Sequence, residues 1–92
     1  MKLVYRLHAV RRMLERQISE NEVRRVIETG EVIARYRDGR PYPSRLILGW
    51  SAGRPRHVLV ADNAADQETV VVTVYEPDPG RWDRAFRRRR RQ

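Results

Sequence analysis

The feature that most restricts the fold is a change in hydrophobic periodicity at Gly30. Before this glycine, apolar residues recur at the three- and four-residue spacing of amphipathic helices. After it, short runs rich in valine and threonine alternate with polar residues and are separated by turn residues, which is typical of strands. Helices that precede a set of strands in this way predict an α+β fold.

Two helices are expected before Gly30. The first covers His8 to Arg16 and has four apolar positions at helical spacing: Leu7, Val10, Met13 and Leu14. The second begins after Ser19, because Ser19 and Glu22 match the capping box in which each side chain satisfies a free amide. Gly30 is expected to end this helix in a left-handed conformation, which glycine adopts at little cost.

Four strands are expected after Gly30, over Glu31–Arg37, Ser44–Trp50, Arg56–Asp62 and Glu68–Tyr75. The connections are short, which favours antiparallel pairing, because a parallel return needs a longer crossover. Residues 2–7 form either a short opening strand or a lead-in. The sequence therefore predicts two N-terminal helices packed on a four-stranded, mainly antiparallel sheet.

Alternation along the last two strands sorts the side chains onto two faces. One face receives valines only and is expected to pack on the helices: Val58, Val60, Val70, Val72 and Val74. The other face mixes apolar residues with His57, Thr73 and Tyr75. A face of this composition is expected to be partly open to water or to a ligand.

Positive charge is concentrated at the C-terminus. The chain has 20 Lys and Arg against 12 Asp and Glu, a net charge of +8, and residues 81–92 hold seven arginines and one aspartate. We expect one α+β domain over residues 1–80, followed by an Arg-rich helix or tail over 81–92 in which Trp82 and Phe86 dock on the domain. Such a tail suits RNA or an acidic protein, although a solvated end that keeps the protein soluble has the same composition.

Several classes of chemistry are excluded. The chain has no cysteine, so disulfides, thiol catalysis and Cys-ligated metals are ruled out, and two histidines are too few to indicate a zinc site. It contains no Walker loop, no G-x-G-x-x-G and no G-x-S-x-G motif. We expect neither a metal nor a cofactor. No apolar stretch approaches a membrane span and no secretory signal opens the chain, so a cytoplasmic protein is expected.

The first helix carries a candidate site. His8, Arg12 and Arg16 are spaced four residues apart and therefore lie on one side of the helix. An imidazole beside two guanidinium groups can transfer a proton next to a phosphate. The alternative is structural: His8 caps the helix, and the arginines pair with nearby carboxylates.

The mixed sheet face supplies the other candidates. His57 and Tyr75 are proposed catalytic residues together with His8 and Arg12; the alternative for both is ordinary packing. RNA provides its own 2′-oxygen nucleophile, so histidine, tyrosine and arginine suffice to cleave it without a metal. The arginines expected to bind nucleic acid are Arg16, Arg45, Arg54, Arg56, Arg87, Arg88 and Arg89.

Short strings along the chain resemble a widespread prokaryotic family of small domains of unknown function. They include His8-Ala9, Arg12-Met13, Ile18-Ser19, Tyr42-Pro43-Ser44, Gly53-Arg54-Pro55, His57-Val58 and the run Thr73–Pro79. That family resembles the RelE/ParE superfamily of toxins. The resemblance implies a helix–helix–sheet fold, ribonuclease activity on mRNA that is either free or bound to the ribosome, and a cognate antitoxin of zinc-finger or helix-turn-helix type.

Two functions remain open from the sequence. The first is a toxin-like, metal-independent endoribonuclease acting on mRNA. The second is a non-catalytic module that binds nucleic acid or protein through its Arg-rich tail. A ParE-like protein that blocks its target by docking is a third, weaker reading.

Overall fold

The computed structural model describes residues 1–91, and Gln92, the last residue of the expected tail, lies outside the described part. Two helices and five strands follow in the order β1 (Lys2–Tyr5), α1 (Leu7–Arg16), α2 (Glu20–Thr29), β2 (Glu31–Tyr36), β3 (Ser44–Ser51), β4 (Arg54–Asn63) and β5 (Glu68–Tyr75). Within residues 1–91, no helix has both the length and the apolar character needed to cross a bilayer.

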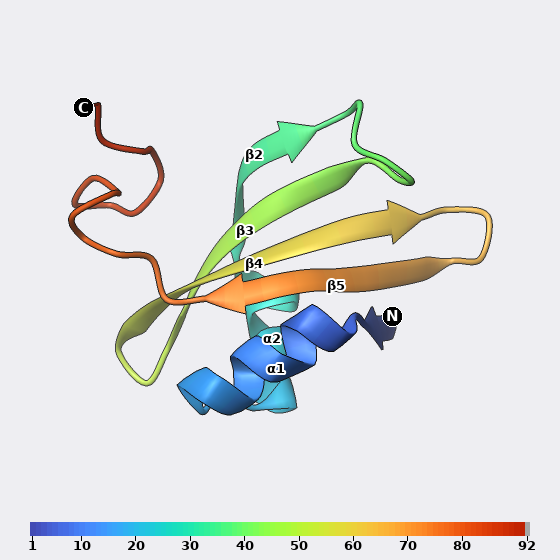
Figure 1. Ribbon diagram of the computed structural model, residues 1–92, viewed down its shortest axis with the longest axis horizontal. Coiled ribbons are helices and arrows are strands. Elements are labelled where there is room, and N and C mark those ends of the chain that lie inside the picture. Colours follow the sequence, from blue (N-terminus) through green and yellow to red (C-terminus); the bar gives the residue numbers. More distant parts are fainter. Residues whose placement is uncertain (92) are drawn as a thin grey trace.

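The sheet has five strands in the order β1-β5-β4-β3-β2 (Figure 1). Strands β2 to β5 pair antiparallel as expected, but β1 pairs parallel to β5 at the edge of the sheet. The prediction of a four-stranded, mainly antiparallel sheet is therefore wrong, and the α+β sheet is five-stranded and mixed. The opening residues become a strand because Leu3 and Tyr5 alternate and pack against the core.

One face of the sheet packs on the two helices, which lie below it in Figure 1. Val58, Val60 and Val74 belong to this core as predicted, but on β5 Val71 joins them in place of Val70 and Val72. The pairing of β4 with β5 skips Val72, so a bulge shifts the alternation by one residue. Because periodicity alone cannot reveal a bulge, the predicted set of five inward valines was partly wrong.

Helix α1 contacts the core through a narrow side. Ala9 is fully buried and Met13 packs against the core. The other apolar positions of the helix face solvent, with exposed fractions of 66% for Leu7, 37% for Val10 and 76% for Leu14. We call these three residues the α1 stripe, because spacings of three and four place them on one side of the helix.

Helix α2 begins as predicted. The Glu22 amide donates to the Ser19 hydroxyl at 3.1 Å, and the Ser19 amide donates to the Glu22 carboxylate at 2.7 Å, which completes the capping box. Gly30 ends the helix, but with extended backbone at φ −78°, so the expected left-handed conformation is wrong. Glycine is required there for space: a Cβ atom would lie 2.4 Å from the Val26 carbonyl oxygen and 2.6 Å from the Ile47 side chain.

The second face of the sheet is covered at one end by the C-terminal segment, which we define as residues 77–91 (Figure 1). Its described residues contain no α-helix. The chain instead folds back on itself, because the Asp83 amide donates to the Arg88 carbonyl at 2.9 Å and the Arg90 amide to the Arg81 carbonyl at 2.8 Å. Trp82 is buried against the sheet, so its expected docking is confirmed.

Replacing Gly30 with alanine tests this packing. We expect Gly30→Ala to lower the free energy of unfolding by about 1–3 kcal/mol, because the added methyl group overpacks the junction of α2 and β3. Urea denaturation followed by circular dichroism measures the change. Gly80→Ala is the matched control: its Cβ would meet only Asp78 at 3.3 Å or more, so we expect a change within about 0.5 kcal/mol. Equal losses in the two variants would contradict the packing argument.

Candidate functional site

A solvent-open hollow of about 490 Å³ lies between α1, the end of β5 and the C-terminal segment. We call it the α1 groove. Helix α1 contributes His8, Arg12 and Arg16, which confirms that these residues share one side of the helix. The remaining lining residues are Thr73, Tyr75, Glu76, Asp78, Arg81, Trp82 and Arg89.

His8 stands at the mouth of the groove. It is exposed, and its Nε2 lies 3.1 Å from the Thr73 hydroxyl, which orients the ring toward the end of β5. Arg12 is held by Glu15 at 2.9 Å, one helical turn away, whereas Arg16 forms no ion pair within residues 1–91. His8 is therefore fixed in direction while remaining accessible to a ligand.

His57 does not reach solvent. Its exposed fraction is zero, because the C-terminal segment seals it. The centroids of the His57 and Trp82 rings lie 4.4 Å apart, and the two ring planes are nearly perpendicular. Its Nε2 lies 2.7 Å from the carbonyl oxygen of Phe86. A carbonyl can only accept, so Nε2 carries the proton and Nδ1 of the neutral ring is an acceptor. The expectation that His57 lies on a face open to a ligand is therefore wrong.

Tyr75 connects buried His57 to the α1 groove. Its hydroxyl lies 3.1 Å from His57 Nδ1 and donates to that nitrogen, because Nε2 holds the ring proton. Burial raises the pKa of Tyr75, against an opposing effect of the Arg89 charge, so the phenol is neutral. With its proton directed inward, the Tyr75 oxygen offers a ligand an acceptor rather than an acid.

The groove is positive overall. Four arginines line it against the carboxylates of Glu76 and Asp78, which leaves a formal charge of +2. Glu76 is also paired with two arginines that do not line the groove, Arg54 at 2.6 Å and Arg56 at 2.8 Å. The hydrogen bond from Arg54 is the main reason why the pKa of Glu76 lies below its ordinary value. Arg54, Arg56 and Arg16 line an adjoining hollow of about 330 Å³.

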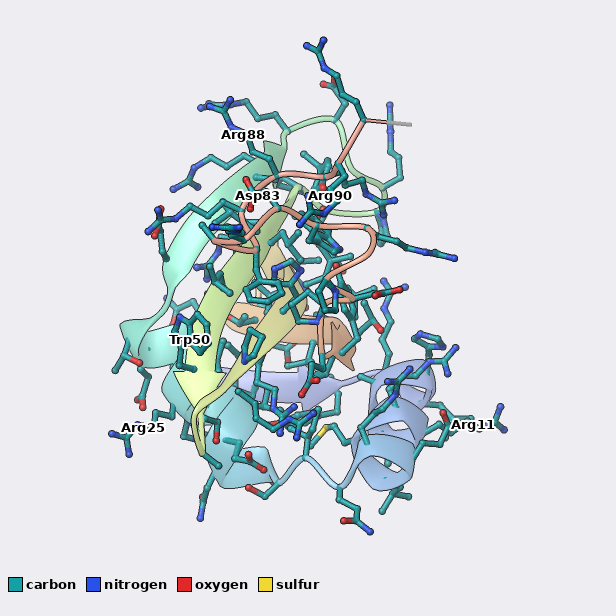
Figure 2. All side chains as sticks on the ribbon, turned by 90° about the vertical axis from the view of Figure 1, so that its left-hand side faces the viewer. Arg11, Arg25, Trp50, Asp83, Arg88 and Arg90 are labelled. Carbon is teal, nitrogen blue, oxygen red and sulfur yellow. The ribbon has the colours of Figure 1, made fainter. Side chains whose placement is uncertain are left out.

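The other arginines expected to bind nucleic acid are dispersed. Arg45 is held by Asp62 at 2.9 Å, away from the groove, so the structure does not bring it to His8. Arg87 pairs with Glu31 at 2.8 Å, and Arg88 lies on the side of the C-terminal segment that faces away from the helices (Figure 2). Arg89 lines the groove, and its guanidinium carbon lies 5.4 Å from the centre of the Trp82 ring.

Sequence reasoning missed one wall of the groove. Arg81 and Trp82 line it because the chain turns sharply after β5, where the amides of both residues donate to the Asp78 carbonyl. Pro77 and Pro79 were the available signal, since two prolines so close together end a strand and favour a turn. In the described part of the chain, no three His, Cys, Asp or Glu side chains cluster as metal ligands would.

A family model described as Domain of unknown function (DUF4258) matches residues 5–76. The chain belongs to the DUF4258 family. Membership confirms the expected resemblance to a family of small domains of unknown function. No curated protein and no solved structure gives a significant match. The DUF4258 match ends at Glu76, so Arg81, Trp82 and Arg89 contribute a wall of the groove from outside the matched region.

Buried His57 makes stability depend on pH. Burial lowers its pKa in the folded DUF4258 protein, although the Phe86 carbonyl opposes the shift. The unfolded chain therefore gains a proton first as the pH falls below about 6.5. The stabilising contribution is fully present above that pH and is lost as the pH falls toward the lowered folded-state pKa.

We expect the free energy of unfolding to decrease between about pH 8 and about pH 5.5, and His57→Gln to reduce this dependence. Urea denaturation at a series of pH values measures it. His8→Gln is the matched control, because it makes the same substitution at the exposed histidine, outside the sealed site. Should His57→Gln fail to fold, NMR of the wild-type imidazole protons gives the same information. A His57 ring that titrates at or above the ordinary value would contradict the sealed geometry.

Proposed function

We propose that this DUF4258 protein is a toxin-like, metal-independent endoribonuclease that cuts mRNA, and that its family is related to the RelE/ParE toxins. The observation that carries the proposal is the α1 groove, in which accessible His8 shares one open hollow with four arginines and Tyr75. Proton transfer beside a cluster of guanidinium groups is the chemistry that metal-free cleavage of RNA requires.

The arginines bind the scissile phosphate. Arg16 and Arg81 form no ion pair within residues 1–91, so their guanidinium groups are available to phosphate oxygens. Arg89 lies over Trp82 and adds a third positive charge on the opposite wall. In the transition state, charge develops on the phosphate oxygens, and the guanidinium groups stabilise it by charge-assisted hydrogen bonds.

His8 acts as the base. Its imidazole removes the proton of the 2′-hydroxyl, and the 2′-oxygen attacks the adjacent phosphorus. The bond from phosphorus to the 5′-oxygen breaks, and that oxygen takes a proton from water, which enters because the groove is open. The products are a 2′,3′-cyclic phosphate and a 5′-hydroxyl, and His8 then releases its proton to solvent.

Tyr75 orients the nucleotide. Its hydroxyl proton is committed to His57, so Tyr75 accepts a hydrogen bond from the ribose or base and does not act as the acid. His57 has a positioning role, because it fixes the Tyr75 hydroxyl from inside the protein. This assignment revises the expected roles: the proton moves through His8, and His57 stays buried behind the site.

Substituting His8 tests the proposal. We expect His8→Ala to lower the rate of cleavage of a labelled single-stranded RNA by about 10²–10⁴-fold, because the general base is lost. Cleavage should continue in EDTA, fail on the all-deoxy analogue and leave 5′-hydroxyl ends, read by gel electrophoresis with and without polynucleotide kinase.

Arg37→Gln is the control, since it removes an arginine from the β2–β3 turn rather than from the groove. We expect it to cleave like the wild type. Melting temperatures confirm that both variants fold. Cleavage that persists unchanged in His8→Ala would refute the assignment, and wild-type protein that binds RNA without cutting it would favour a non-catalytic binding module.

A toxin requires a partner, and the α1 stripe is the surface that we assign to it. Leu7, Val10 and Leu14 face solvent on the helix that also carries the groove. Arg6 and Arg11 flank the stripe and form no ion pair within residues 1–91, and Arg11 projects away from the body of the protein (Figure 2). An acidic amphipathic helix of an antitoxin-like protein complements this surface, whereas a second copy would carry the same charge of +8.

Substituting Leu14 tests this surface. We expect Leu14→Glu to weaken binding of a small acidic protein encoded by the adjacent gene by about 10-fold or more, measured by calorimetry. Asn21→Glu is the matched control, because it adds the same charge at an exposed position of α2 outside the stripe. Full affinity in Leu14→Glu would place the partner elsewhere.

A non-catalytic module remains the second candidate, and the seven arginines of residues 81–92 favour it. Salt-dependent binding without strand scission distinguishes it. Single substitutions such as Arg81→Gln are preferable to deletion of residues 87–92, because the C-terminal segment also covers His57.

A further inference from the structure

A second hollow, of about 490 Å³, lies on the other side of the C-terminal segment, beside Trp50. The protein has two tryptophans with opposite environments: Trp82 is 7% exposed and Trp50 is 54% exposed. Trp50 and Arg25 lie on the same flank in Figure 2, distant from Arg11 on α1. We call this site the Trp50 hollow; it shares none of its lining residues with the α1 groove.

The Trp50 ring is held in place rather than merely exposed. The Phe86 ring packs against it at 6.0 Å between centroids, with 73° between the ring planes. Phe86 is itself fixed, because its carbonyl accepts the hydrogen bond from buried His57 and its backbone lies in the left-handed region at φ 58°. A non-glycine residue in that region costs free energy and persists where surrounding contacts hold it, often beside a ligand site.

Charged side chains line the hollow together with the Trp50 ring. Arg25 is exposed and forms no ion pair within residues 1–91, whereas Arg87 and Glu31, which also line the hollow, are paired with each other. The hollow also includes Thr29 and Gly30, at the carbonyl end of α2. Helix carbonyl ends disfavour anions and favour hydrogen-bond donors, so a phosphate belongs beside Arg25 and donor groups belong near Gly30.

An aromatic face, an unpaired guanidinium and nearby acceptors match the chemistry of a nucleotide. The base stacks on the indole, the exocyclic amino groups meet the carbonyl end of α2, and the phosphate meets Arg25. We propose that the Trp50 hollow binds one nucleotide of single-stranded RNA by stacking, as a contact separate from the α1 groove. This inference rests on the proposed function in one respect, that the ligand is RNA.

Tryptophan fluorescence tests the proposal directly. The protein carries His8→Ala so that RNA stays intact, and the probe is a 12-nucleotide oligoadenylate at low salt. We expect binding to quench the emission of exposed Trp50, and Trp50→Leu to abolish that quenching and to weaken affinity by about 5- to 100-fold. Trp50→Phe, which keeps an aromatic face, should retain part of the affinity.

Arg25→Gln tests the phosphate contact. It should weaken binding and reduce the slope of log affinity against log salt by about one. Arg37→Gln removes the same charge from the β2–β3 turn, and its slope should stay at the wild-type value. Oligonucleotide binding with unchanged Trp50 emission, or with full affinity in Trp50→Leu, would overturn the Trp50 site.

The two proposals fail separately. Wild-type protein that does not cut RNA while Trp50 emission is quenched would refute the endoribonuclease and support the stacking site. Cleavage that depends on His8 and is indifferent to Trp50→Leu, with no quenching, would refute the stacking site and leave the endoribonuclease in place.

Discussion

Burial of His57 between the sheet and the C-terminal segment is the contact on which the rest of the structure depends. A buried imidazole is unfavourable unless both nitrogens have partners, and here Phe86 accepts from one nitrogen and Tyr75 donates to the other. Trp82 packs edge-on against the ring. These contacts hold the C-terminal segment on the sheet, and that segment supplies a wall of the α1 groove on one side and a wall of the Trp50 hollow on the other.

Helix α1 serves three surfaces with ten residues. Ala9 and Met13 meet the core, His8 and its arginine neighbours line the groove, and the α1 stripe faces solvent. Ala9 makes this arrangement possible, because a side chain of that size lets the helix lie close to β5 along a narrow contact. At about 100° per residue, the stripe lies on nearly the opposite side of this short helix from His8, Arg12 and Arg16.

Local signals in the sequence predicted local structure well. The capping box at Ser19, four of the five strands and the common side of His8, Arg12 and Arg16 depend on neighbouring residues, and all are confirmed. Apart from the backbone conformation of Gly30, the errors concern long-range features. A bulge at Val72, the parallel pairing of β1 and the cover over His57 depend on segments that meet only in the folded chain. For the same reason Arg45, which looked equivalent to Arg16, is paired with Asp62 away from the groove.

The cover over His57 also determines which imidazole is open to solvent. The DUF4258 match includes His57 and Tyr75 but ends before the segment that seals His57. The composition of the mixed face suggested that His57 is open to solvent, but Phe86 and Trp82 of that segment contact its ring. With the segment in place, water and ligands reach Tyr75 from the edge of β5, where α1 supplies a different imidazole. The proton-transfer role that we propose therefore falls to His8 on the helix rather than to a histidine on the sheet, and the buried histidine holds the hydroxyl beside it.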